Sequence, residues 1–152
     1  MTHRLTWMAL LWLTLAMPVV AETHRVDDRQ SQVLGRALRL KPIAPYARGM
    51  QANVVAGDVT VLVRLDVAAW KGRRGRIYMT LPEQSGGTVT ATWTTRGHLM
   101  PGVVRTGGRT LVYSGLLRNG LLEDTLRLNL QADERRLPRD AQLAFAFEID
   151  LD

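Results

Sequence analysis

The sequence contains no cysteine and only three histidines among its 152 residues. Without cysteine the chain has no disulfide scaffold, no thiolate metal site, no thiol nucleophile and no lipid-modified N-terminal cysteine. Lysine is also scarce, with two residues against eighteen arginines. With 46% hydrophobic and 22% charged residues, the composition is typical of a globular domain and excludes long disorder or a fibrous repeat.

Long apolar runs are missing except at the N-terminus, where the run from Leu5 to Met17 is broken only by threonines. Arg4 precedes this run, and a short segment ending at Ala21 has the small residues that signal peptidase requires. The run is shorter than the roughly 20 residues of a membrane span, and no second run follows. We therefore predict a signal peptide over residues 1–21, a periplasmic or secreted, cell-surface location, and no membrane span after cleavage.

Hydrophobic residues alternate with polar ones along most of the remaining chain, and turn signals recur about every ten residues. No ten-residue helical pattern lies among these six or seven short segments, which favours an all-β fold. The spacing predicts an antiparallel β-sandwich, immunoglobulin-like in the broad sense, with a small closed β-barrel as the alternative. The alternating residues expected to face the interior are Val59, Val61, Val63, Leu65, Val67, Ile77, Met79, Leu81, Val89, Ala91, Trp93, Leu126, Leu128, Leu130, Leu143, Phe145, Phe147, Ile149 and Leu151.

The chain after the signal divides into two parts. Residues 22–36 are polar, with apolar positions spaced as in a short helix, so we expect a polar leader that is flexible or forms a short helix. Residues 37–152 contain no linker or repeat and are predicted to be a single β-sandwich domain. The clean apolar face of the segment from Gln142 to Leu151 suits a strand that pairs within the sheet or is lent to a neighbouring subunit.

Catalytic motifs are missing. No serine lies in a Gly-x-Ser-x-Gly motif, and no glycine-rich loop leads from a strand into a helix. The paired carboxylates, such as Glu123 and Asp124, are adjacent in sequence, so on a strand they point to opposite faces and are expected in turns or at the rim. The sequence therefore predicts a protein that is not an enzyme, with no catalytic residues and no cofactor required.

Basic residues exceed acidic ones by six, and they are unevenly placed. Residues 22–109 carry a net charge of +8, whereas residues 110–152 carry −3. The densest cluster holds four basic residues that we expect to contact an acidic partner, in a hairpin loop between two strands. They are Lys71, Arg73, Arg74 and Arg76. An envelope protein or acidic polymer suits this cluster better than nucleic acid, because few aromatic residues lie nearby to stack on bases.

One alternative is metal binding. Cleavage after Ala21 leaves a chain that begins Glu22-Thr23-His24, whose amine, two amide nitrogens and imidazole suit square-planar copper or nickel. His98 and Met100, two residues apart, are candidate ligands of a second site.

These features lead to one functional expectation and one rival. The sequence predicts an exported, non-enzymatic binding or structural module of the bacterial cell envelope, either a surface or pilus-type subunit or a periplasmic accessory protein. It acts through protein–protein or polyanion contacts, and the segment from Gln142 to Leu151 leaves strand pairing open as a route to oligomers. The rival is a periplasmic copper- or nickel-binding protein.

Overall fold

A computed structural model describes residues 22–35, 38–44, 48–49, 53–83, 87–137 and 144–152. The predicted signal peptide over residues 1–21 lies outside these ranges. Within the described part of the chain, no helix is both long and apolar enough to cross a membrane.

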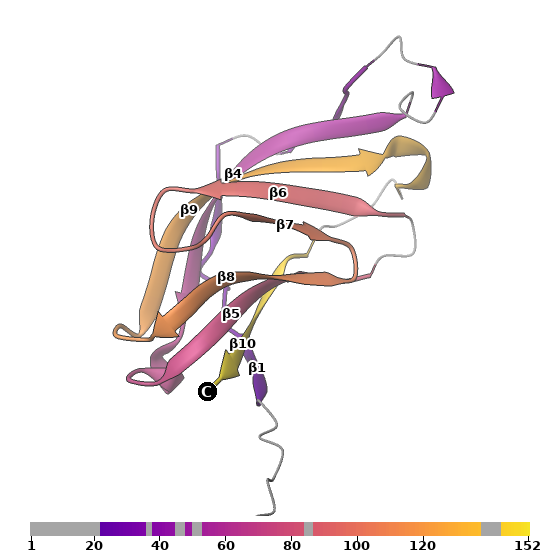
Figure 1. The fold of residues 1–152 in the computed structure, drawn as a ribbon. Helices are drawn as coiled ribbons and strands as arrows, with labels where there is room; N and C mark the ends of the chain where they lie inside the picture. The colour runs from indigo at the N-terminus through magenta and orange to yellow at the C-terminus, as the bar shows by residue number, and fades with distance from the viewer. Residues whose placement is uncertain (1–21, 36–37, 45–47, 50–52, 84–86, 138–143) are drawn as a thin grey trace, which may run out of the picture.

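Two antiparallel sheets pack face to face (Figure 1). Sheet A has the strand order β1-β10-β5-β8, and sheet B has the order β2-β4-β9-β6-β7, with β3 also paired to β4. The predicted antiparallel β-sandwich is confirmed, and because the strands divide into two sheets the closed-barrel alternative is not what forms. The strands are β1 Thr23–Val26, β2 Gln32–Leu34, β3 Lys41–Pro42, β4 Val54–Asp66, β5 Arg74–Leu81, β6 Val89–Thr95, β7 Gly102–Arg105, β8 Gly108–Leu116, β9 Leu121–Asp133 and β10 Ala146–Leu151.

The core lies between the sheets, where period-two alternation directs every second side chain inward. Trp93, Val63 and Phe147 are each at most 3% exposed, as the alternation predicts. The Nε1–H of Trp93 donates to the carbonyl of Met100 at 2.9 Å, so the largest core side chain has no unsatisfied polar atom. Val61 is only partly buried, because it lies near the side of the sandwich closed by the short strand β2.

β4 and β5 belong to different sheets, so the connection between them is not the hairpin that the sequence predicted. A short 3₁₀ helix, Ala68–Trp70, carries the chain across the end of the sandwich. The turn that follows uses Gly72 at φ +85°, a conformation that suits glycine. Glycine-bounded turns look alike in sequence whether they join neighbouring strands or opposite sheets, which explains the error.

In place of the expected flexible or helical leader, the described residues 22–35 contain two short strands. β1 pairs with β10 in sheet A, a bridge joins Asp27 to Asp66, and β2 then pairs with β4 in sheet B. Val26 is fully buried, whereas Thr23 and Arg25 are exposed, so this short segment already has the alternation of a strand. The open edges of β10 and β4 supply backbone partners that outweigh the weak helical spacing.

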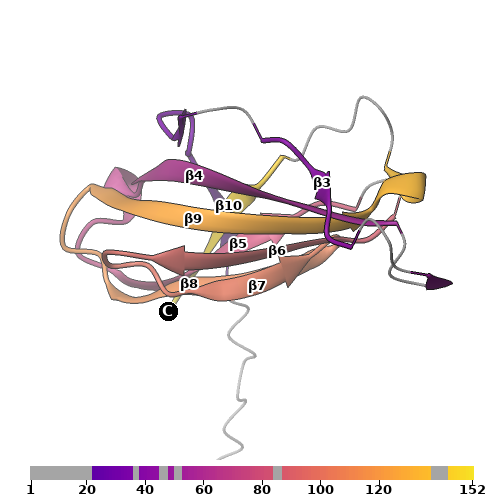
Figure 2. The same cartoon turned by 90° about the horizontal axis from the view of Figure 1, so that it is seen from above.

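β10 lies between β1 and β5, with partners on both sides (Figure 1). β10 is therefore an internal strand of sheet A. Of the two roles expected for this segment, it pairs within its own sheet and is not lent to a neighbouring subunit. Its partners leave it no open edge to lend. Residues 142 and 143, which the sequence assigned to the same strand, lie outside the described residues. In sheet B, β4 and β9 run side by side (Figure 2).

Candidate functional site

Two connections at one end of the sandwich are joined by backbone hydrogen bonds. One runs from β4 to β5 and the other from β8 to β9. Val67 N–H donates to Gly120 O at 2.8 Å, Gly72 N–H to Leu117 O at 2.8 Å, and Leu117 N–H to Arg73 O at 2.9 Å. These three bonds hold the two connections in a fixed arrangement.

This arrangement brings a fourth basic residue, Arg118, beside three members of the predicted cluster. We call Lys71, Arg73, Arg74 and Arg118 the basic end. All four are exposed. No described carboxylate lies within 4 Å of their charged groups. Sequence reasoning missed Arg118 because it stands more than forty residues along the chain, and only the pairing of the two connections reveals it.

Arg76, the remaining member of the predicted cluster, lies on the outer face of sheet A, two residues along β5 from Arg74. Its Nη2 is 3.4 Å from a carboxylate oxygen of Asp152. Arg76 shares this face with Arg74, because alternate positions of β5 point the same way, and it differs from the other three in having a carboxylate partner.

The same outer face holds an ion-paired network around Asp150, which is only 6% exposed. Thr23 Oγ1 donates to Asp150 Oδ1 at 2.7 Å, and Arg109 Nη2 donates to Oδ2 at 2.6 Å. The guanidinium of Arg109 also stacks 3.9 Å from the ring centroid of Tyr78. The hydrogen bond from Thr23, followed by the bond and charge of Arg109, lowers the pKa of Asp150 although burial opposes the shift.

The proposed N-terminal metal ligands are part of the sheet. Thr23 and His24 are in register with Asp150 and Ile149 of β10. The imidazole of His24 lies against the indole of Trp70, with ring centroids 5.6 Å apart. Wrapping a metal with the amides of both residues requires the start of β1 to leave the sheet, so the metal-binding alternative stays a prediction.

His98 and Met100 lie elsewhere, in the loop between β6 and β7 of sheet B. His98 is exposed, and Met100 donates its N–H to Val112 O at 2.7 Å. The structure does not bring them to His24, which lies in sheet A. Among the described residues there is no group of three or more histidine, aspartate or glutamate side chains placed to hold a metal.

Sheet B carries two adjoining hollows that the sequence did not predict, the first on its outer face and the second along the edge of β4 between β2 and β3. Thr60 of β4, Arg127 of β9 and Thr94 of β6 are in register across three neighbouring strands. The first hollow, of about 410 Å³, lies over them and is lined by Leu34, Thr60, Thr94, Thr95, Arg96, Thr125 and Arg127.

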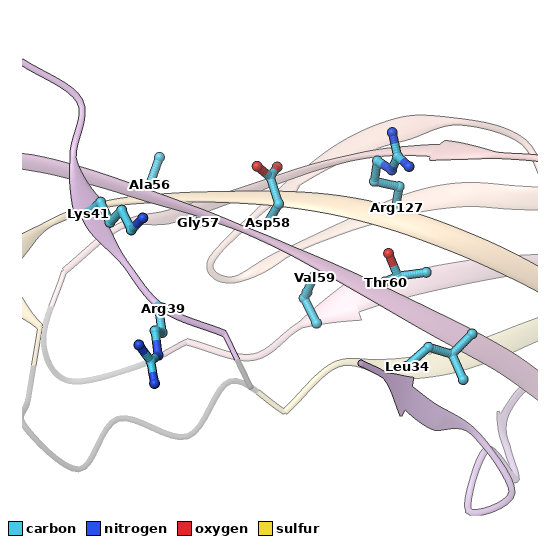
Figure 3. A pocket seen from close by; sticks show the side chains of 9 residues that line it. All are labelled: Leu34, Arg39, Lys41, Ala56, Gly57, Asp58, Val59, Thr60 and Arg127. Carbon is cyan, nitrogen blue, oxygen red and sulfur yellow. The ribbon is translucent and has the colours of Figure 1, made fainter. Parts of the chain in front are cut away.

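The second hollow, of about 480 Å³, continues along β4 and shares three lining residues with the first, Leu34, Thr60 and Arg127. Figure 3 shows Asp58, Thr60 and Arg127 rising on one side of the sheet, whereas Arg39 points to the other. The remaining residues that line the second hollow are Lys41, Ala56, Gly57 and Val59. We call the two hollows together the threonine–arginine trough.

A buried carboxylate fixes one end of this trough. Asp124 is 5% exposed and accepts hydrogen bonds from the N–H groups of Leu99 at 2.8 Å, Thr125 at 2.7 Å and Arg96 at 3.4 Å. A Cβ at Gly97 would lie 2.9 Å from Asp124 Oδ1, so the loop approaches this carboxylate closely because it has glycine there. The sequence prediction that Asp124 lies in a turn or at the rim is therefore wrong.

The adjacent Glu123 points outward and pairs with Arg64, as expected for neighbours on a strand. The basic end and the threonine–arginine trough are thus the two surfaces on which exposed cations gather without carboxylate partners among the described residues. Neither a protein-family model nor a curated protein matches this chain.

Proposed function

We propose that the protein is an exported, non-enzymatic binding module of the bacterial cell envelope. It docks through the basic end onto an anionic macromolecule, an envelope protein with an acidic face or an acidic polymer. The observation that carries this proposal is the pair of connections held together by three backbone hydrogen bonds, which carries four exposed basic side chains at one end.

Two physical features support this use. A cluster of like charges raises the local concentration of an oppositely charged partner and speeds its association. Arginine is suited to contact carboxylates because its planar guanidinium forms two parallel hydrogen bonds with them. Since the two connections are fixed by their backbone bonds, binding need not order a flexible loop, which reduces the entropic cost.

The test compares two triple variants of equal charge. R73Q/R74Q/R118Q removes three arginines of the basic end, and R48Q/R105Q/R136Q removes three exposed arginines elsewhere. The probe is immobilised poly-L-glutamate, which displays carboxylates as an acidic partner does, and the readout is the affinity at several salt concentrations.

We expect R73Q/R74Q/R118Q to bind about tenfold more weakly, since three exposed charge contacts of about 0.5 kcal/mol each are lost. The control variant retains most of the affinity. Equal losses in both variants would show that net charge, and not this surface, governs binding, and would overturn the proposal.

A further inference from the structure

We propose that the threonine–arginine trough is a binding site for an acidic oligosaccharide, a linear chain of sugars that bear carboxylate groups. The site is separate from the basic end, because it lies over the outer face of sheet B and the edge of β4, and none of its lining residues belongs to the basic end. It is independent of the function proposed above.

The trough offers hydroxyl groups for the neutral part of such a ligand. Thr60, Thr94 and Thr125 line the first hollow from three different strands. A threonine hydroxyl both donates and accepts a hydrogen bond, as a sugar hydroxyl does. Thr95 differs, since its Oγ1 already donates to Leu99 O at 2.7 Å. In the described part of the chain, no such bond occupies the other three.

Cations along the trough match the acidic part of the ligand. Arg127 lies at the junction of the two hollows, Arg96 lines the first and Lys41 the second. None of the three has a described carboxylate within 4 Å. Asp58 is the one carboxylate among the described lining residues, and its Oδ1 accepts a hydrogen bond from Asn129 Nδ2 at 3.0 Å. The lining is therefore cationic overall.

The shape favours a chain over a single small anion. From Thr60 to Thr94 the first hollow crosses two strand spacings, or about 10 Å. From Ala56 to Thr60 the second follows β4 for about 13 Å. Cations at both ends and in the middle of this path suit a ligand that repeats its negative charge along its length.

The lining also favours an acidic oligosaccharide over nucleic acid and over a protein partner. No described aromatic side chain lines either hollow, so there is no platform for stacking nucleic-acid bases. Leu34 is the only large apolar side chain that both hollows share, which is little for a protein interface with an aromatic or apolar centre. Hydroxyls and guanidinium groups remain as the main contacts.

The backbone that carries the polar groups is held in place before a ligand arrives. Arg127 projects from the centre of the β4-β9-β6 ladder. Arg96 follows β6 directly, and its backbone is held by Asp124. Binding therefore has to order the arginine side chains but not the backbone, which limits the entropic cost.

The experiment is calorimetric titration of the protein with a hexasaccharide of uronic acids, with a neutral hexasaccharide of glucose as the control ligand. R127Q is expected to reduce the affinity for the hexauronate at least tenfold, since a charge-assisted contact is lost at the centre of the site. T94V keeps the side-chain shape but removes one hydroxyl, and reduces affinity a few-fold. D58N removes the one opposing carboxylate and increases affinity.

R105Q supplies the matched control, because Arg105 is exposed on β7 of the same sheet but lines neither hollow. We expect R105Q to change the affinity for the hexauronate by less than twofold. Equal losses in R105Q and R127Q, or equal binding of the neutral and acidic sugars, would overturn the proposal. R73Q/R74Q/R118Q retains hexauronate binding in the trough even where it loses poly-L-glutamate, so the two proposals fail separately.

Discussion

The outer faces of the two sheets pair their charged residues to different extents. On sheet A, Asp150 of β10 is paired with Arg109, and Asp152, which directly follows β10, is paired with Arg76. On sheet B, Arg64 is paired with Glu123, but Arg127 lies among threonines in a trough whose described lining includes one carboxylate. Charges that are paired within the fold contribute to stability, whereas charges left without partners are available to a ligand. The comparison separates a structural face from a binding face.

The largest expected effect comes from the core that holds the faces together. Val63→Asp in sheet B and Phe147→Asp in sheet A each place a charge at a buried position. Burying a carboxylate without a partner costs far more than these side chains contribute, so each variant is expected to lose more than about 4 kcal/mol and unfold. Thermal unfolding followed by circular dichroism measures this. A soluble variant that unfolds cooperatively near the wild-type temperature would mean that the inward face is misassigned.

The next effect concerns the buried carboxylate beneath the trough. Asp124→Ala leaves three backbone N–H groups without their acceptor, which is expected to cost about 2–3 kcal/mol in the free energy of unfolding. Because the loop that carries Arg96 is then no longer fixed, hexauronate affinity falls as well. Urea unfolding and calorimetry give the two quantities. Lower stability with unchanged affinity would show that the position of Arg96 does not matter for binding.

The network of sheet A predicts a smaller effect that depends on pH. Because the pKa of Asp150 is lower in the folded than in the unfolded chain, its contribution to stability is full above the unfolded value, about 3.9, and is lost as pH falls through the folded value. Asp150→Asn is expected to cost about 1–2 kcal/mol near neutral pH, a value reduced because Arg109 is 42% exposed.

The measurement is urea unfolding of wild type and D150N between about pH 2 and pH 7. The difference between the two proteins should shrink toward the acidic end. A difference that stays constant with pH would contradict the assigned role of the carboxylate.

The smallest effect is expected on the face of sheet B. Arg127→Gln removes an exposed charge that has no described carboxylate partner, so the free energy of unfolding should change by less than about 0.5 kcal/mol. The same substitution lowers ligand affinity, which distinguishes a binding residue from a structural one. A loss of stability as large as that of D150N would remove the distinction between the faces.

The strands were predictable wherever hydrophobic and polar residues alternate over a long segment. β4, β5, β6, β9 and β10 alternate over several residues between turn signals, and a period of two leaves a strand as the simplest interpretation. β1 and β2 have four and three residues, which is too short for periodicity to decide between strand and helix. Their structure depends on the open edges of β10 and β4, which the sequence does not display.

The candidate surfaces were predictable only where they are local. Lys71, Arg73 and Arg74 are contiguous enough to be seen as a cluster, but Arg118 joins them through hydrogen bonds between distant connections. The threonine–arginine trough arises from the register of β4, β9 and β6, which lie far apart in the sequence. A threonine-rich strand in isolation indicates β structure and says nothing of a groove.

The most direct test of the difference between the two faces is a map of amide chemical shifts in the isotope-labelled protein as the hexauronate is added. The account predicts that shifts concentrate at Thr60, Thr94, Thr125 and Arg127 of sheet B and leave Tyr78 and Glu148 of sheet A unchanged. Shifts that fall equally on both outer faces, or mainly on sheet A, would contradict it.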